Sequence, residues 1–143
     1  MPRGIPSSVM HYFERVPLFA GLSKRGLRRV VRAASEIDEP EGTVLVREGD
    51  QGRELYVLVD GYARVTRKNR KVAEIGPGDF FGELAFLSHA QRTATVTATS
   101  PVRLMILGAR ELEALLREEP QIGTKMLGTV ATRLREVERS PSH

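Results

Sequence analysis

Two side chains of opposite charge in one short segment could together bind a phosphorylated sugar. Glu83 follows Gly82, and Arg92 and Thr93 stand at the far end of the segment. A glycine lets the backbone pass close to a ligand, and a helix that begins after it offers free amide hydrogens to an anion. The guanidinium of Arg92 can bind two phosphate oxygens at once and keeps its charge, while Thr93 adds a hydroxyl. These residues predict a phosphate site.

The carboxylate of Glu83 narrows the class of ligand. A carboxylate beside a phosphate site is repulsive unless the ligand also carries hydroxyl donors, as a ribose does. Dinucleotide sites of another fold use the same combination, with a carboxylate on the ribose and amides on the phosphate. Glu83 and Arg92 therefore predict a nucleotide site, and the structural alternative is a salt bridge between them that closes a loop.

The composition excludes several other chemistries. With 143 residues, 41% of them hydrophobic and 28% charged, the chain has the size and apolar content of one compact domain. It has no cysteine, which rules out disulfides, cysteine-bound metals and thiol nucleophiles. Its histidines, His11, His89 and His143, are scattered, whereas a cupin-type enzyme needs them clustered around a metal. We therefore predict no enzyme and no metal.

The hydropathy of the chain indicates its cellular location, and its charge indicates which partners it could bind. No stretch approaches the roughly 18 to 20 apolar residues of a membrane span, and the N-terminus lacks the apolar segment of a signal peptide, so we expect a cytoplasmic protein. The net charge of +4 is modest. Basic residues gather at 25–32 and 67–71, where they form either a nucleic-acid patch or, as we prefer, a solvated helix face and hairpin tip.

The elements that must position the site run from helical to strand-rich and back to helical. Residues 23–34 predict an amphipathic helix capped by Ser23, and a helix is expected from 109 until Pro120 ends it, followed by a last helix over about 121–138. Between them, short β-rich runs separated by turn residues indicate a sandwich or barrel, and one helical turn follows Gly82. The predicted strands are 43–46, 54–59, 62–66, 71–75, 93–98 and 102–107.

The last helix carries a further apolar pattern. Leu127, Val130, Leu134 and Val137 follow the spacing of a short coiled-coil seam. This seam could form a dimer contact, close over a ligand, or pack against the strands of its own chain. Fewer than three heptads leave these alternatives open.

Several motifs, in order along the chain, resemble the cyclic nucleotide-binding domain family, found in bacterial catabolite activators, protein kinase regulatory subunits and cyclic-nucleotide-gated channels. The segments FGELA at 81–85 and RTATV at 92–96 are similar to the phosphate-binding cassette of that family. The likeness extends to PLFAGL at 17–22, EGD at 48–50, LYVLVDG at 55–61 and IGPGD at 75–79. It covers roughly residues 13 to 138.

The resemblance implies a mainly β fold with flanking helices. We expect an eight-stranded antiparallel jelly-roll barrel with N-terminal helices and two C-terminal helices. The cyclic nucleotide-binding domain would span 13–138, with the barrel at about 42–107 and the C-terminal helices at about 109–138, between an N-terminal tail of 1–12 and a C-terminal tail of 139–143.

The resemblance also implies a signalling function, in which the domain binds cAMP or cGMP, needs no cofactor, and couples binding to movement of the C-terminal helix. By the same likeness, the ribose would be held by Gly82 and Glu83. The cyclic phosphate would be held by Ala85, Arg92 and Thr93, and the pocket around the base would include Phe81, Leu84, Thr93, Ala94 and Arg133.

The base and the partner are less determined by the resemblance. Thr93 favours cGMP, although family members with this threonine include some that prefer cAMP. Arg133 aligns with an arginine that contacts adenine in the activators, but Val137 and Glu138 stand where the activators have hydroxyl residues. No helix-turn-helix follows, so we expect no direct reading of DNA. The partner would be a second copy bound through the C-terminal helix, or an effector outside this chain.

Two other functions remain open beside the cyclic nucleotide sensor. One is a degenerate scaffold, or a regulator that binds another metabolite. The other, less favoured, is a nucleic-acid-binding module that uses the basic patches.

Overall fold

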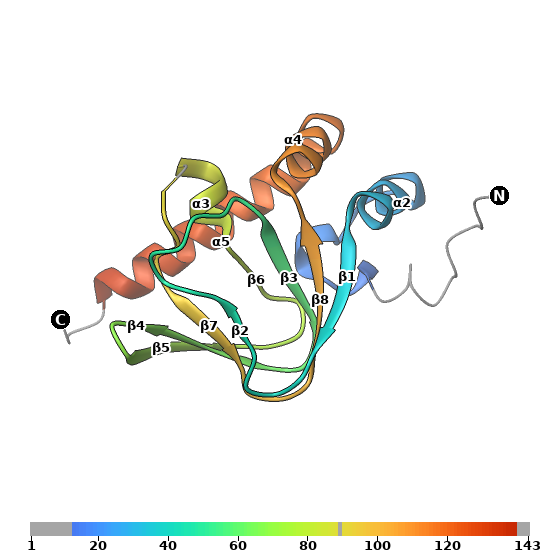
Figure 1. Cartoon of the computed structure of the whole chain (residues 1–143). Coiled ribbons are helices and arrows are strands. Elements are labelled where there is room, and N and C mark those ends of the chain that lie inside the picture. Colours follow the sequence, from blue (N-terminus) through green and yellow to red (C-terminus); the bar gives the residue numbers. More distant parts are fainter. Residues whose placement is uncertain (1–12, 89, 140–143) are drawn as a thin grey trace.

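Eight strands form two four-stranded antiparallel sheets, and helices cover one of them (Figure 1). The computed structural model describes residues 13–88 and 90–139, without the side chains of 84, 85 and 136–139. The first sheet contains, in spatial order, β1 (Ser35–Glu39), β8 (Val102–Leu107), β3 (Leu55–Asp60) and β6 (Phe80–Phe81). The second contains β2 (Val44–Val46), β7 (Thr95–Ala98), β4 (Ala63–Arg67) and β5 (Arg70–Ile75).

Two apolar cores follow from the alternation of side chains along the strands of the first sheet. Val57 and Val59 of β3 point into a core shared with the helices, where Leu27 and Leu112 are also buried. Leu58, between the two valines, points to the opposite face and joins a second core between the two sheets. The strand β3 is therefore buried on both faces of the first sheet.

The six strands predicted from the sequence are confirmed, with boundaries shifted by no more than two residues. The strands β1 and β6 were not predicted. The β1 segment is polar and mostly exposed, without the apolar alternation of a half-buried strand, and only its backbone pairing with β8 identifies it. It also precedes the barrel start expected at 42. A closed barrel is not confirmed, since strand pairing among the described residues stays within each sheet.

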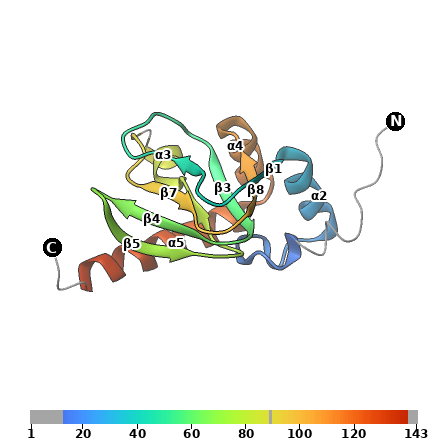
Figure 2. The ribbon, with the colours of Figure 1, turned by 60° about the horizontal axis from the view of Figure 1, so that its bottom comes forward.

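Among the described residues, the N-terminal helices are the short 3-10 helix η1 (Pro17–Phe19) and α2 (Lys24–Ala33). The predicted cap of α2 is confirmed, because the hydroxyl of Ser23 accepts a hydrogen bond from the amide of Gly26 at 3.0 Å. The predicted helix interior is also confirmed within one residue at each end. This helix lies beside α4 (Ala109–Glu118), opposite the β4–β5 hairpin (Figure 2).

The last helix, α5 (Pro120–Arg139), begins at the proline that was expected only to end the preceding helix. Proline suits the first turn, where no amide hydrogen is needed. Ile122 and Met126 of this helix are buried in the helical core. Within the described residues, no helix combines the length and the apolar character that a membrane span requires.

Candidate functional site

The bend after β6 positions both charged residues of the predicted site. Gly82 has a φ of +91°, and α3 (Glu83–Ser88) begins directly after it, as predicted. A Cβ atom at Gly82 would lie 2.7 Å from Arg92 Nη1 and 2.7 Å from the carbonyl oxygen of Glu54. Both the left-handed backbone and the space available therefore require glycine here.

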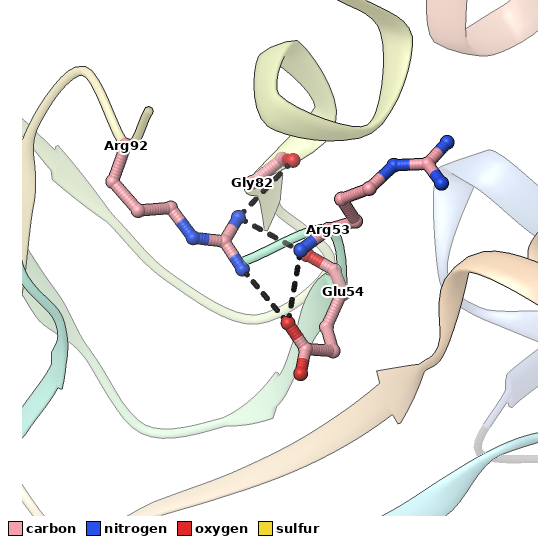
Figure 3. Close-up of polar contacts among 4 residues, drawn as sticks. All are labelled: Arg53, Glu54, Gly82 and Arg92. Carbon is pink, nitrogen blue, oxygen red and sulfur yellow. Dashed lines mark hydrogen bonds and ion pairs between the residues drawn. The ribbon is translucent and has the colours of Figure 1, made fainter. Parts of the chain in front are cut away.

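The guanidinium of Arg92 is held at the inner end of this bend. Its side chain is only 5% exposed. Nη1 donates hydrogen bonds to the carbonyl oxygens of Glu54 and Gly82, at 3.2 and 3.3 Å, and Nη2 donates to Oε1 of Glu54 at 3.2 Å (Figure 3). Burial of this cation is thus compensated by two backbone carbonyls and one carboxylate.

Glycine at position 52 gives the guanidinium its space. A Cβ atom there would lie 2.8 Å from Arg92 Nη2 and 3.2 Å from Arg92 Nε. Sequence analysis did not identify this glycine. Glycine is required here by the space that Arg92 occupies and not by the backbone conformation, so the requirement can be recognised only from the position of Arg92 in the structure.

Tyr56 forms one wall beside the guanidinium. The Cζ atom of Arg92 lies 5.5 Å from the centroid of the Tyr56 ring, and that ring stacks on Phe81 at 5.0 Å. Burial raises the pKa of the Tyr56 phenol, and the carboxylate of Glu54 raises it further, while the cation of Arg92 opposes both. Tyr56 therefore stays a neutral donor, and it is a second site residue that the sequence analysis missed.

Glu83 pairs with the last helix rather than with Arg92. Its side chain is 8% exposed, and its Oε1 accepts a hydrogen bond from Nη1 of Arg133. Nη2 of Arg133 also donates to the carbonyl oxygen of Phe80 at 2.7 Å, and the guanidinium lies over the Phe80 ring. The structural alternative, a salt bridge between Glu83 and Arg92, is therefore wrong.

A pocket of about 170 Å³ opens beside Arg92, with Glu54, Tyr56 and Arg47 among its lining residues. A larger hollow, of about 380 Å³, lies between α2 and α4, away from the cassette. Arg29, which lines that hollow, already pairs with Glu119 at 2.7 Å. The smaller pocket is the candidate site, because the buried cation of Arg92 is one of its lining residues.

The other predicted site residues have varied positions. Phe81 is buried, Thr93 is exposed, and Ala94 is partly buried. The backbone of Leu84 and Ala85 belongs to α3, and their side chains lie outside the described residues. Arg133, predicted for the pocket around the base, is brought to Glu83 instead of to the pocket beside Arg92.

The three histidines, His11, His89 and His143, lie outside the described residues. Within the described part of the chain, no group of three or more histidine, aspartate or glutamate residues could hold a metal ion. The expectation that these histidines form no metal site therefore stays a prediction from the sequence.

Two members of the predicted apolar seam of the last helix, Leu127 and Leu134, lie on its exposed face. Leu127 is 61% exposed and Leu134 is 58% exposed, while Val130 is partly buried. The side chain of Val137 lies outside those described. For Leu127 and Leu134, packing against the strands of their own chain is therefore wrong, whereas for Val130 and Val137 this alternative stays open.

Comparison with known proteins places this geometry in one family. The family model of the cyclic nucleotide-binding domain matches residues 38–119. A cyclic nucleotide-gated potassium channel of Rhizobium etli is 36% identical over 118 residues, covering 82% of this chain and 33% of the channel. The chain thus spans about a third of that relative.

Solved structures agree with this match. The crystal structure of the Thermus thermophilus catabolite activator protein is similar at a TM-score of 0.79 and 30% identity, over 85% of this chain and 60% of that one. The regulatory subunit of a cAMP-independent protein kinase A from Trypanosoma cruzi, bound to guanosine, is similar at a TM-score of 0.73 and 29% identity, over 83% of this chain and 43% of that one. This protein belongs to the cyclic nucleotide-binding domain family.

Proposed function

We propose that this chain is a regulatory domain, spanning 13–138, that binds cAMP or cGMP and has no catalytic role. The observation that carries the proposal is the buried guanidinium of Arg92 beside a pocket, at the end of a cassette that also contains Glu83. A monoanionic cyclic phosphate complements such a cation, and the family match supports this class of ligand.

In this proposal, the phosphate is bound by Arg92 together with the hydroxyl of Thr93 and the amides of Ala85 and Thr93. The ribose hydroxyl donates to the carboxylate of Glu83, with the amide of Gly82 nearby. Phe81, Leu84 and Ala94 complete the surroundings of the ligand. The burial of Glu83 supports its role, since a buried carboxylate gains most from an added donor.

In this proposal, fewer residues contact the base of the nucleotide than its phosphate and ribose. We propose that Thr93 contributes to binding guanine through its hydroxyl, while Arg133 approaches the base from α5. The exposure of Thr93 is compatible with a contact to a base at the pocket mouth. Both cAMP and cGMP therefore remain the ligands to be tested.

The coupling to α5 is proposed to run through the pair of Glu83 and Arg133. A ribose hydroxyl that binds Glu83 changes the partner of Arg133, and this arginine belongs to α5. The ligand then shifts the position of the helix by its differential affinity for the two arrangements, typically about 1 to 3 kcal/mol.

For the partner, we propose a second copy of this chain, bound through the exposed seam of α5. Leu127 and Leu134 stand seven residues apart on its outer face, as in a coiled coil, and each exposes more than half of its surface. An effector outside this chain is the alternative.

A second candidate is a regulator that binds a nucleoside without phosphate. Two observations favour it. Glu54 already binds Arg92, and one relative of known structure is bound to guanosine. Adenosine and guanosine are therefore tested beside the cyclic nucleotides.

The experiment is a calorimetric titration of wild type and Arg92→Ala with cAMP and cGMP. Loss of two charge-assisted hydrogen bonds, worth about 1.5 to 3 kcal/mol each, should weaken binding by more than about 100-fold. Arg103→Ala is the matched control, because Arg103 also pairs with a carboxylate, Asp38 at 2.8 Å, but on the strands β8 and β1. Equal affinities of Arg92→Ala and wild type would contradict the proposed function.

A further inference from the structure

The guanidinium of Arg92 has one edge fixed by backbone and another edge that remains available for an anion. Both hydrogens of Nη1 are used by the carbonyl oxygens of Glu54 and Gly82. The remaining donors, on Nε and Nη2, form the edge next to Gly52. A phosphate that binds Arg92 through two oxygens must use this edge.

A carboxylate of the same chain already binds one donor of this edge, Nη2. Oε1 of Glu54 accepts a hydrogen bond from Nη2 of Arg92 at 3.2 Å and another from the amide of Arg53 at 3.1 Å (Figure 3). The side chain of Glu54 is 47% exposed, whereas that of Arg92 is 5% exposed. The carboxylate can therefore rotate into water, while the cation stays in place.

We infer that Glu54 is an internal competitor of the ligand phosphate and sets the affinity of the site. The inference rests on the proposed function. Two anions on one guanidinium edge repel each other, so a bound phosphate displaces the carboxylate of Glu54 from Arg92. Glu54 thus compensates the buried cation when no other anion does, and each phosphate that binds must first break this pair.

The size of the pocket supports such an exchange. Its volume of about 170 Å³ lies below the roughly 300 to 1,000 Å³ that is usual for pockets holding small molecules. Glu54 is one of the lining residues, so its rotation toward solvent widens the pocket. The same movement that frees the edge of Arg92 therefore makes room for the ligand.

Competition by Glu54 also affects the choice between ligands. A ligand with a phosphate replaces the carboxylate of Glu54 and regains the lost interaction with Arg92. A nucleoside has no anion to offer and regains nothing. Glu54 therefore penalises a ligand with phosphate, and its removal should help only such a ligand.

The test compares Glu54→Gln with wild type and with Glu113→Gln. Glutamine keeps the shape of the side chain and a hydrogen-bond acceptor but removes the charge. Glu113 is a matched control, because its side chain is also 47% exposed and pairs with an arginine, Arg53 at 3.7 Å. In calorimetry at fixed ionic strength, Glu54→Gln should bind cAMP or cGMP about five-fold more tightly, the gain expected for one partly exposed ion pair. Glu113→Gln should match wild type within about two-fold.

Inorganic phosphate separates this inference from the proposed function. If wild type binds no cyclic nucleotide, the proposed function fails, but phosphate still tests the competition at Arg92. Millimolar phosphate should then raise the melting temperature of Glu54→Gln more than those of wild type and Glu113→Gln. Adenosine and guanosine should bind equally to wild type and Glu54→Gln.

Three results would overturn the inference. The first is a cyclic nucleotide affinity of Glu54→Gln equal to or below that of wild type. The second is a gain for the nucleosides as large as the gain for the cyclic nucleotides, which would assign the effect to pocket shape. Where no cyclic nucleotide binds, the third is an equal response of the three proteins to phosphate, including no response.

Discussion

The two ends of the candidate site are built differently. At the end proposed for the phosphate, called the phosphate end below, Arg92 is fixed by carbonyl oxygens of the loop before β3 and the bend after β6. At the end proposed for the ribose, called the ribose end, Glu83 is paired with Arg133, which comes from the last helix. The first arrangement depends on the sheet, whereas the second depends on where α5 lies.

We expect this difference to separate ligand binding from the response of α5. The arginine at the phosphate end is 5% exposed and cannot leave without breaking backbone hydrogen bonds. The arginine at the ribose end is 37% exposed and belongs to α5, whose main backbone neighbours are α4 and η1 rather than a strand. We expect the phosphate end to determine whether a ligand binds, and the ribose end to determine what the helix does afterwards.

The strongest way to break this comparison is to distort the bend at the phosphate end. Gly82→Ala should lower the free energy of unfolding by more than about 2 kcal/mol and weaken ligand binding more than ten-fold, because the new Cβ meets a backbone oxygen at 2.7 Å. Denaturant unfolding and calorimetry measure the two effects.

Gly42→Ala measures how much of the expected loss of unfolding free energy comes from backbone strain alone, without a steric clash. Gly42 has the same φ of +91°, and nothing lies within 4 Å of its added Cβ. It should cost only about 1 to 2 kcal/mol and leave affinity unchanged. Similar affinities for Gly82→Ala and Gly42→Ala would argue against a phosphate end fixed by this bend.

A smaller effect is expected at the ribose end. Arg133→Ala should weaken cyclic nucleotide binding by no more than about ten-fold, yet abolish the ligand dependence of amide hydrogen exchange in α5. Arg135→Ala, an exposed position on the same helix, serves as the control and should keep both properties. If Arg133→Ala lost as much affinity as Arg92→Ala, both ends would determine ligand binding, and the expected separation of binding from the response of α5 would be wrong.

The smallest effect concerns the outer face of α5. Replacing both Leu127 and Leu134 with glutamine should turn a dimer into a monomer in light scattering, with a change of about 0.5 kcal/mol or less in protomer stability, because both side chains are exposed. Thr132→Gln, exposed outside the seam, should leave the mass unchanged. A monomeric wild type at high concentration would exclude the second copy as partner.

The sequence allowed prediction of the parts of the site that lie close together along the chain. Gly82, Glu83 and Arg92 belong to one segment, and residue chemistry with spacing was enough to connect them. Tyr56 belongs to the distant strand β3 and Glu54 directly precedes it, and they reach the site because β3 pairs with β6 in the register Tyr56 to Phe81. No local pattern encodes that pairing.

The elements of the fold likewise differ in whether the sequence could predict them. Strands with apolar alternation and the capped helix were predicted, since local spacing determines them. The polar strand β1 was not, because its position depends on backbone pairing with β8, far along the chain. The ion pair of Glu83 with Arg133 was missed for the same reason, as it joins residues 50 positions apart.

The attachment of the first turns of α5 gives the helix a pivot. Ile122 and Met126 are buried, and Lys125 donates a hydrogen bond to the carbonyl of Ala20, so this stretch is anchored to the rest of the domain. With a rise of about 1.5 Å per residue, the last turn lies about 20 Å beyond Met126. In the proposed coupling, a tilt of about 10° around this pivot would displace that turn by about 3 Å, so that a small change at Glu83 would become a larger displacement at the end of the helix.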